Sequence, residues 1–348
     1  MKGQMKAVVK KTAAPGGELL QVDIPATGPG EILVKVLAAS ICGTDHHIYM
    51  WNEWAQGRIK PPKIMGHEFC GEVVETGKGV TSVKAGDLVS AETHIVCGRC
   101  PLCLTGKGHV CMDTHILGVD VDGVFAEYVA IPESNAWVND KGIDPGLASI
   151  QEPLGNAVHT LLSGDIIGRT VLITGCGPIG LMAVAVARAV GASAVFASDI
   201  NEYRIDLAKK LGANRVFNAS RENVLEGILE ETGGHGVDVV AEMSGSINVI
   251  KQSLDMVKRG GRISLLGLPS KPVELELSEK LIFKGVTVKG ITGRQMYDTW
   301  FRVKGLLASG RLNIQPVITH HFSLEEYQKG MELMDSGNCG KVILYPNR

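Results

Sequence analysis

A glycine-rich turn between an apolar strand and an apolar helix constrains this chain more than any other feature. Residues 170–192 read TVLITGCGPIGLMAVAVARAVGA, with Gly175, Gly177 and Gly180 in a G-x-G-x-x-G pattern. The first glycine permits a tight turn, the second lets the backbone approach a pyrophosphate, and the third allows close helix-to-strand packing. The start of the helix offers amide donors to the same anion. The run therefore predicts a dinucleotide-binding βαβ unit.

The segments that follow this turn continue the alternation of strand and helix. Apolar strand-like and helical runs occupy residues 194–199, 201–212, 215–218, 237–245 and 262–268. Strands that alternate with helices indicate parallel pairing in a doubly wound α/β sheet.

The first 155 residues follow a different pattern. Short β-like runs separated by Gly and Pro turns lie at 7–10, 32–40, 71–77, 87–93 and 126–132. They predict an antiparallel β-rich domain. Later, residues 300–310 predict a helix, and residues 340–346 predict a strand that returns to this first domain. Two domains are also expected from the length of 348 residues, because single cores stop growing near roughly 250–300 residues.

Charge and terminal sequence narrow the classes of partner. The net charge of −2 provides no broad basic field for nucleic acid or an anionic membrane. The N-terminal residues lack a secretory pattern, and no run approaches the roughly 20 apolar residues of a membrane span. We therefore expect a cytoplasmic protein. In that compartment, the eight cysteines indicate metal binding or catalysis rather than disulfides.

Four of the cysteines form one compact set. Cys97, Cys100, Cys103 and Cys111 lie in CGRCPLCLTGKGHVC with spacing C-x2-C-x2-C-x7-C. Four thiolates at this spacing are typical of a closed, tetrahedral structural zinc site. An iron–sulfur cluster is the chemical competitor, but the last gap is long and no Pro follows Cys111, unlike the bacterial ferredoxin run. The pattern favours zinc.

A second set combines three different ligand types. Cys42 lies in SICGTDHHIY, and His67 and Glu68 lie in IMGHEFCGEVV. Taken singly, they read as a buried thiol, a core histidine and a surface acid. Mixed sulfur, nitrogen and oxygen ligands with an open position are typical of a catalytic zinc. Together with the four-cysteine run and the dinucleotide pattern, the set predicts such a site.

The choice of dinucleotide depends on an acid beyond the glycine turn. Asp199 ends the next apolar strand, where a carboxylate accepts hydrogen bonds from the adenosine ribose. NADP would bring its 2′-phosphate against that charge, so the position favours NAD. Arg204, five residues on, leaves an alternative open. Its guanidinium either binds that phosphate or stacks on adenine from the helix surface.

The GHE block, the four-cysteine lobe and the glycine pattern together resemble the zinc-containing medium-chain alcohol dehydrogenases over essentially the whole chain. The resemblance implies an α/β two-domain fold. A GroES-like β-rich catalytic domain with both zinc sites would comprise 1–155 and 296–348, and a Rossmann NAD-binding domain would comprise 156–295. The active site would lie in the cleft between them.

The resemblance also implies residue roles. Cys42, His67 and Glu68 would hold the catalytic zinc, and the Cys97 set would hold the structural one. Thr44 and His47 would relay the substrate proton, although His46 beside His47 leaves that assignment open. Glu152 would be catalytic, as an exchangeable zinc ligand or in proton transfer. NAD contacts would come from Gly175, Gly177, Gly180, Ile179, Asp199, Arg204, Leu266, Gly267, Leu268, Ile291 and Thr292. Relatives often carry Glu where this chain has Asp199.

Three segments specify the implied reaction: CGTDHHIYMWNEWAQGRIKPPKIMGHE, VSAETHIVCGRC and IQEPLGNAV. The resemblance of these segments implies an enzyme of threonine catabolism that uses zinc and NAD to oxidise the secondary hydroxyl of L-threonine to 2-amino-3-oxobutyrate. The family as a whole suggests a homotetramer. A polyol such as sorbitol, or 2,3-butanediol, is the alternative substrate within the family. An alternative of another class is a dinucleotide-binding protein without catalysis, which would be expected to lack the open zinc ligands.

Overall fold

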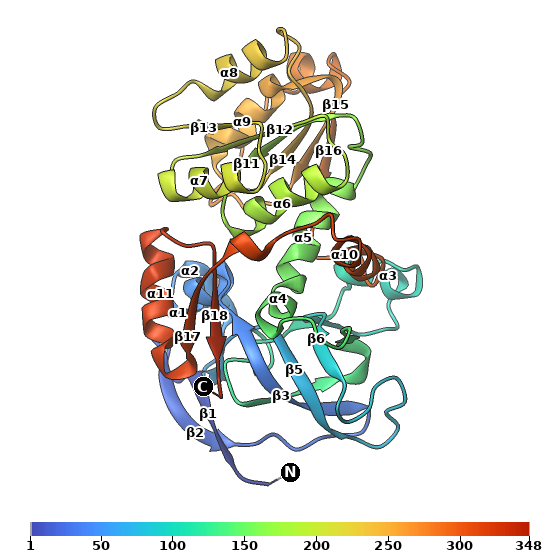
Figure 1. The fold of residues 1–348 in the computed structure, drawn as a ribbon, viewed down its shortest axis with the longest axis vertical. Helices are drawn as coiled ribbons and strands as arrows, with labels where there is room; N and C mark the ends of the chain where they lie inside the picture. Colours follow the sequence, from blue (N-terminus) through green and yellow to red (C-terminus); the bar gives the residue numbers. More distant parts are fainter. Residues whose placement is uncertain (1, 348) are drawn as a thin grey trace. The chain divides into compact units, whose positions relative to one another are not determined.

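The strands before helix α5 (Gln151–Leu162) pair antiparallel, and those between residues 170 and 290 pair in parallel, as the sequence pattern predicts. The computed structural model describes residues 2–347. They form two compact units (Figure 1). Unit 1 comprises the residues up to Glu152 and from Ile318 onward, and unit 2 comprises Pro153–Val317.

Unit 1 is built on a seven-stranded sheet with the order β10-β6-β5-β3-β18-β17, in which β9 also pairs with β3. Its strands are β3 (Glu31–Ser40), β5 (Glu68–Thr76), β6 (Leu88–Ala91), β9 (Tyr128–Pro132), β10 (Ala136–Val138), β17 (Ile318–Ser323) and β18 (Lys341–Tyr345). Two smaller sheets contain β1 (Gln4–Lys10), β2 (Glu18–Asp23) and β4 (Lys63–Ile64), and β7 (His94–Val96) with β8 (Thr114–Ile116). The helices are α1 (Gly43–Met50), α2 (Glu53–Arg58), α3 (Pro101–Leu104), α4 (Pro145–Ser149) and α11 (Tyr327–Ser336).

The central strand β3 organises unit 1. Ile32, Val34 and Val36 on this strand are fully buried, in line with its long apolar run. They belong to a core that includes Phe69 and Phe125. On one side β3 pairs with β5, and on the other it pairs antiparallel with β18. The predicted return of the last strand to the first domain is confirmed.

Unit 2 contains six parallel strands in the order β13-β12-β11-β14-β15-β16. They are β11 (Thr170–Thr174), β12 (Ala194–Asp199), β13 (Arg215–Asn218), β14 (Val237–Glu242), β15 (Val257–Leu265) and β16 (Thr287–Gly290). Numbered from β11, this order is 3-2-1-4-5-6, which is typical of doubly wound dinucleotide-binding sheets. The predicted Rossmann sheet is confirmed.

Helices cover both faces of this sheet (Figure 1). α6 (Pro178–Ala189) and α7 (Glu202–Lys210) pack on β11, β12 and β13, and α9 (Ile247–Met256) packs on β14 and β15 beside α8 (Val224–Glu231). In α6, every residue from Gly180 to Ala187 is buried. The helix is therefore apolar nearly all round, as its sequence suggests.

The second boundary between the units differs from the sequence expectation of residue 295. Residues 296–317, including the predicted helix α10 (Asp298–Ala308), fall in unit 2. Arg302 donates to the Leu162 carbonyl of α5, and the Thr299 methyl faces the position that a Gly155 side chain would occupy. These contacts with α5 hold α10 in unit 2.

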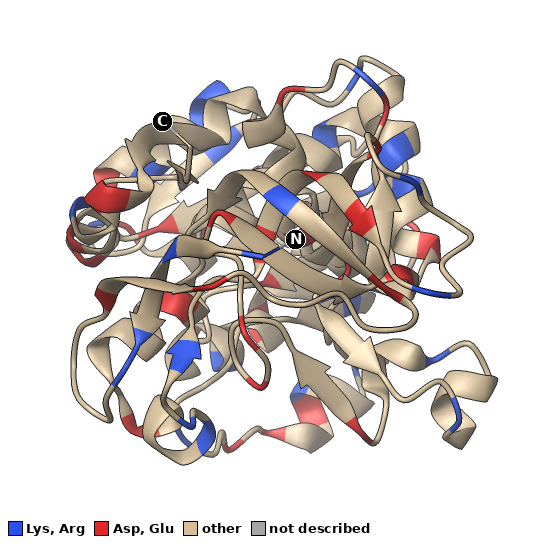
Figure 2. Cartoon of the chain, turned by 90° about the horizontal axis from the view of Figure 1, so that it is seen from below, with Lys and Arg blue, Asp and Glu red and all other residues tan. Residues whose placement is uncertain are grey.

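Charged residues of both signs are intermixed along the ribbon in Figure 2. Among the described residues, no helix is both long and apolar enough to cross a membrane.

Candidate metal and cofactor sites

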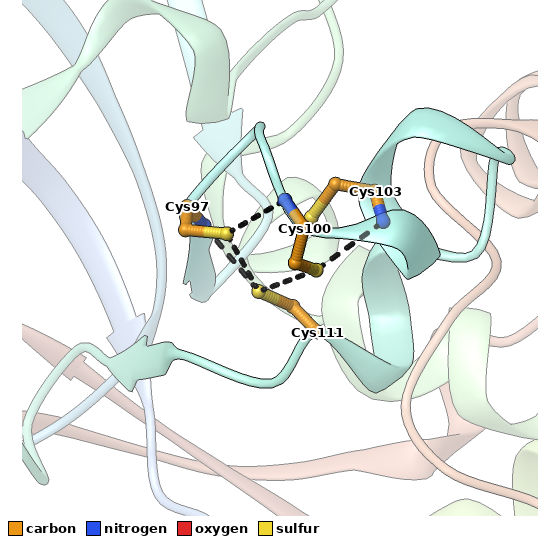
Figure 3. Close-up of side chains that lie close together, drawn as sticks. All are labelled: Cys97, Cys100, Cys103 and Cys111. Carbon is orange, nitrogen blue, oxygen red and sulfur yellow. Dashed lines mark hydrogen bonds between the residues drawn. The ribbon is translucent and has the colours of Figure 1, made fainter.

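The four-cysteine run folds into a lobe between β7 and β8 that turns its four side chains toward one point (Figure 3). The four Sγ atoms all lie within 4.8 Å of one another, and Sγ of Cys111 lies 3.5 Å from Sγ of Cys97 and 3.8 Å from Sγ of Cys100. All four are free thiols. A compact set of four thiols without a disulfide fits a tetrahedral metal ion.

The lobe stabilises the thiolate of Cys100, the form that binds metal, whereas burial and the neighbouring thiols raise the pKa of Cys103 to about 12. The amide of Cys100 donates to Sγ of Cys97, and the amide of Cys103 donates to Sγ of Cys100. Backbone hydrogen bonds from Met112 and Cys103 lower the pKa of Cys100 to about 6. The lobe is therefore suited to bind a cation through sulfur.

The second predicted set also converges in unit 1. Ligand atoms of Cys42, His67 and Glu68 lie within 4.8 Å of one another, although 24 residues separate Cys42 from the other two in sequence. Cys42 caps the N-terminus of α1, and Glu68 begins β5. His67 and Glu68 are buried. The set fits a metal ion with sulfur, nitrogen and oxygen ligands.

Asp45 joins this cluster from the first turn of α1. Its Oδ2 accepts a hydrogen bond of 2.8 Å from the Cys42 amide, and its Oδ1 lies 3.2 Å from Nδ1 of His67. Burial lowers the pKa of His67, but attraction from Asp45 and Cys42 outweighs it and raises that pKa well above its usual value. Asp45 thus contacts two members of the candidate ligand set, the backbone amide of Cys42 and the imidazole ring of His67.

Two side chains donate hydrogen bonds to the carboxylate of Glu68. Nζ of Lys341 lies 2.6 Å from Oε1 and 2.5 Å from Oε2, and the Ser40 hydroxyl also donates to Oε2. Both Glu68 and Lys341 are buried. Burial lowers the pKa of the Lys341 ammonium, but attraction from Glu68 outweighs it and raises that pKa.

Glu152 lies near this cluster but outside the compact set. Among the described residues, the compact set whose ligand atoms all lie within 4.8 Å of one another consists of Cys42, His67 and Glu68. Oε1 of Glu152 accepts a hydrogen bond of 3.0 Å from the Thr93 hydroxyl. Its charge adds to the effect of burial in raising the pKa of Glu68.

Thr44 and His47, the two candidate relay residues, lie three positions apart on α1, so they share one face of the helix. His47 is exposed, whereas Nε2 of His46 lies 3.6 Å from Oδ1 of Asp335 on α11. Partial burial, together with repulsion from His46, lowers the pKa of His47. His46 therefore faces a neighbouring helix, and His47 remains open to solvent.

The glycine turn has the geometry that its pattern predicts. Gly175 has φ +88°, and a side chain at Gly180 would lie 1.9 Å from the Gly175 carbonyl oxygen. At Gly177, by contrast, an added Cβ meets no atom within 4 Å, so the outer surface of the turn is open. Gly177 also caps the N-terminus of α6. The turn fits a pyrophosphate against the helix start.

Asp199 lies beside this turn, at the end of β12. Its Oδ2 accepts a hydrogen bond of 2.6 Å from the Cys176 amide, and its Oδ1 accepts one of 2.9 Å from the Asn201 amide. Arg204, on α7, has a buried Nε with no hydrogen-bond partner among the described residues. A buried donor without a partner is costly, so a ligand atom there is favourable.

The remaining predicted cofactor residues follow the carboxyl ends of other strands. Leu266, Gly267 and Leu268 follow β15, and Ile291 and Thr292 follow β16. Ile179 is half-buried in the first turn of α6. In a parallel sheet the carboxyl ends of all strands share one edge, so these residues and Asp199 lie along the ligand-binding edge.

Sequence reasoning missed Asp45, Ser40, Thr93 and Lys341. Asp45 carries a local signal, since it stands three residues after Cys42, as in a capping box. Lys341 is a single lysine at the start of an apolar strand, which is unusual for a buried strand.

Two family models match the chain. The model described as alcohol dehydrogenase GroES-like domain matches residues 28–140, and the model described as zinc-binding dehydrogenase matches residues 178–309. The chain belongs to the zinc-binding alcohol dehydrogenase family. The match over 28–140 also confirms the GroES-like character of unit 1.

Close relatives within the zinc-binding alcohol dehydrogenases carry one name. L-threonine 3-dehydrogenase from Caldanaerobacter subterraneus subsp. tengcongensis is 58% identical over 99% of this chain and 100% of its own length. L-threonine 3-dehydrogenase from Bacillus subtilis is 55% identical over 99% of both chains.

Solved structures of the family share the whole fold. A protein described as a zinc-binding dehydrogenase from Sinorhizobium meliloti, bound to NADP, has a TM-score of 0.91 at 34% identity, covering 99% of this chain and 100% of its own. An alcohol dehydrogenase from E. coli in complex with NADH has a TM-score of 0.90 at 29% identity, covering 98% and 99%. 2R,3R-butanediol dehydrogenase from Bacillus subtilis has a TM-score of 0.89 at 28% identity, covering 99% and 100%.

Proposed function

We propose that the chain is an L-threonine 3-dehydrogenase that oxidises the secondary hydroxyl of L-threonine with NAD to 2-amino-3-oxobutyrate. The observation that carries this proposal is the full-length identity of 58% to a relative of that name. The convergence of Cys42, His67 and Glu68 supports it, because a non-catalytic dinucleotide-binding protein has no need of a mixed-ligand metal cluster.

The roles of individual residues are part of the same proposal. Zinc, when bound, supplies Lewis acidity that lowers the pKa of the substrate hydroxyl, and NAD supplies the hydride acceptor. Cys42, His67 and Glu68 hold the metal, while the Cys97 set holds a second, structural ion. Thr44 accepts the substrate proton, and His47 passes it to solvent. Glu152, which accepts a hydrogen bond from Thr93, acts near the metal as an exchangeable ligand or in proton transfer.

The cofactor residues orient the dinucleotide. The open face of Gly177 receives the pyrophosphate, and the Asp199 carboxylate accepts hydrogen bonds from the adenosine ribose. Arg204, whose buried Nε has no hydrogen-bond partner among the described residues, contacts the adenosine. Leu266, Leu268, Ile291 and Thr292 line the remainder of the binding edge.

The alternative substrates are polyols and 2,3-butanediol, the latter favoured by the structural neighbour of that name. Steady-state rates with NAD decide between them. The highest kcat/KM should belong to L-threonine, measured beside sorbitol and 2R,3R-butanediol in one buffer. A higher value for either alternative would replace L-threonine as the substrate, and no turnover with all three would support the non-catalytic class.

We also propose a cytoplasmic homotetramer, in which unit 1 is the catalytic domain and unit 2 the NAD domain. The free thiols of all eight cysteines fit a reducing compartment. Among the described strands, β16 pairs only with β15, and apolar Ile282, Phe283 and Val288 are exposed at this end of the sheet. Exposed edge strands with apolar side chains are typical of association surfaces. Light scattering should give four chains, and a monomer would contradict the proposal.

A further inference from the structure

Lys10, the last residue of β1, is a buried lysine whose ammonium is surrounded by backbone oxygens. Its Nζ donates hydrogen bonds to the carbonyls of Ala14, Gly16 and Tyr49, the last two at 2.8 Å and 3.4 Å. The ammonium also lies 4.8 Å from the centroid of the Trp51 ring, whose face attracts a cation. Three carbonyls use its three protons. Its partners among the described residues include no carboxylate, and burial lowers the pKa of Lys10 to about 8.

Two of these four contacts belong to the C-terminal end of α1. Tyr49 lies in the last turn of the helix, and Trp51 is the residue that ends it. Carbonyls of a last helical turn lack partners within the helix and carry partial negative charge, so a cation beside them is favourable. Ala14 and Gly16 lie between β1 and β2, and the Gly16 amide donates to the Tyr49 carbonyl at 2.7 Å. Lys10 therefore joins this loop to the end of α1.

The backbone of Trp51 has a conformation that needs such support. With φ 57° and ψ 44°, Trp51 is in the left-handed region, and it is the only described residue other than glycine at positive φ. Glycine usually occupies this position after a helix, because a side chain is strained there. Strained residues persist where neighbouring contacts hold them, and they are frequent at functional sites. In this conformation the Trp51 amide donates to the carbonyls of His47 and Ile48.

His47, the proposed relay residue, lies in this same last turn of α1. The first turn of the helix is fixed separately, since Asp45 contacts two members of the candidate metal cluster. At the other end, the ammonium of Lys10 lies between a helix carbonyl and the indole that caps the helix. The position of the His47 side chain therefore depends on contacts that include this ammonium.

We propose that Lys10 is a positioning residue for the proton relay: its ammonium, held between the Tyr49 carbonyl and the Trp51 ring, fixes the end of α1 that carries His47. This inference rests on the proposed function. Lys10 belongs to neither candidate ligand set and lies outside the glycine turn. Its removal should therefore change the relay step without changing zinc content or NAD binding.

The test is kcat of the full-length protein with L-threonine and NAD at about pH 7, where the ammonium is the main form of Lys10. Lys10→Met keeps an apolar stem of similar length but removes the charge and the donors. It should lower kcat by about 10- to 100-fold, because misplacing a catalytic group by about 1 Å can cost about 100-fold. KM for NAD and zinc content should keep wild-type values. Lys11→Met, at an exposed lysine paired with Glu18, should leave kcat unchanged.

A double-mutant cycle with His47→Ala separates positioning of the relay from a general structural defect. If Lys10 acts through His47, Lys10→Met should lower kcat no further in the His47→Ala background. An equal fold-loss in both backgrounds would overturn the proposal, and so would an unchanged kcat in folded Lys10→Met.

Variants of Trp51 keep the test decisive if Lys10→Met does not fold. Trp51→Gly retains the left-handed backbone without strain but removes the ring, and it should lower kcat only where His47 is present. Trp51→Phe keeps an aromatic face for the ammonium and should retain most of the wild-type kcat. Full activity of Trp51→Gly would overturn the proposal. A wild-type protein that does not oxidise L-threonine would instead contradict the proposed function, and the same cycle would then be run on the alcohol that it does oxidise.

Discussion

Asp45 and His67 form a buried contact in which Oδ1 of the acid lies 3.2 Å from Nδ1 of the imidazole. The side chain of Asp45 is fully buried, and its other oxygen binds the Cys42 amide. The acid therefore orients the ring so that Nε2 is the nitrogen available to a metal. An outer partner of this kind fixes both the tautomer and the ring orientation of a ligating histidine.

The first prediction follows from this contact. Asp45→Ala should weaken zinc binding at the Cys42 site by about 10- to 100-fold, because His67 loses the group that orients it. Chelator competition measures the affinity. Asp335→Ala, which removes the α11 acid that faces His46, is the control that should leave it unchanged. Equal affinities in Asp45→Ala and wild type would show that the contact has no role in metal binding.

The two metal sites should have separable roles. Cys42→Ser should abolish turnover while leaving the folded structure intact, whereas Cys100→Ser should mainly lower the melting temperature, since structural zinc contributes directly to folding. Elemental analysis should find two zinc ions per wild-type chain and one in each variant. A single zinc in the folded wild-type protein would rule out the two-site assignment.

NAD should be strongly preferred over NADP. Asp199→Ala should weaken NAD binding and narrow the difference from NADP, because the repulsion of the 2′-phosphate is removed while Arg204 stays nearby. Dissociation constants for both dinucleotides, determined by fluorescence titration, check this. Asp206→Ala, an exposed acid on the same helix as Arg204, is the control for a general change in charge. Equal use of both cofactors by the wild-type enzyme would contradict the role of Asp199.

His47→Ala should lower kcat for L-threonine by about 10²- to 10⁴-fold, the usual contribution of general acid–base catalysis. Zinc content and NAD affinity should remain close to wild type. Because the pKa of His47 is lowered, its neutral form persists below pH 6.5, and the wild-type rate should fall only in the more acidic range. His46→Ala is the matched control and should lose much less activity. The larger defect in His46→Ala would move the relay to that residue.

Lys10 should make the free energy of unfolding depend on pH in the alkaline range. Its ammonium is buried against the carbonyls of Ala14, Gly16 and Tyr49 and lies 4.8 Å from the centroid of the Trp51 ring. Burial lowers the pKa of Lys10 to about 8 from an ordinary value of 10.5. Between these values the unfolded chain binds more protons than the folded protein.

The contribution of Lys10 to the free energy of unfolding should therefore rise as pH increases from about 8 to 10.5. Urea unfolding at several pH values in this range measures it. Lys10→Met should remove this part of the slope, whereas Lys11→Met, at the exposed neighbouring lysine, should retain it. Identical slopes in Lys10→Met and wild type would contradict the assignment.

Local patterns were sufficient for the four-cysteine set and the glycine turn. The cysteines from Cys97 to Cys111 and the glycines from Gly175 to Gly180 act within short spans, so their spacing already dictates the geometry that they adopt. The local pattern also predicted helix α10 correctly. It assigned this helix to the domain that corresponds to unit 1, whereas the helix lies in unit 2. Periodicity shows that a helix has an apolar face, and it does not show which surface that face covers.

The sequence by itself thus determined the two candidate metal-ligand sets, the glycine turn, and the combination of a largely antiparallel sheet with a parallel one. Only the tertiary structure decided which groups hold the site residues. Asp45 reaches His67, Thr93 reaches Glu152, and Lys341 reaches Glu68. The physical reason is that these partners are selected by strand order and burial, since β3 must lie between β5 and β18 before an isolated lysine in the last strand meets a glutamate far earlier in the chain.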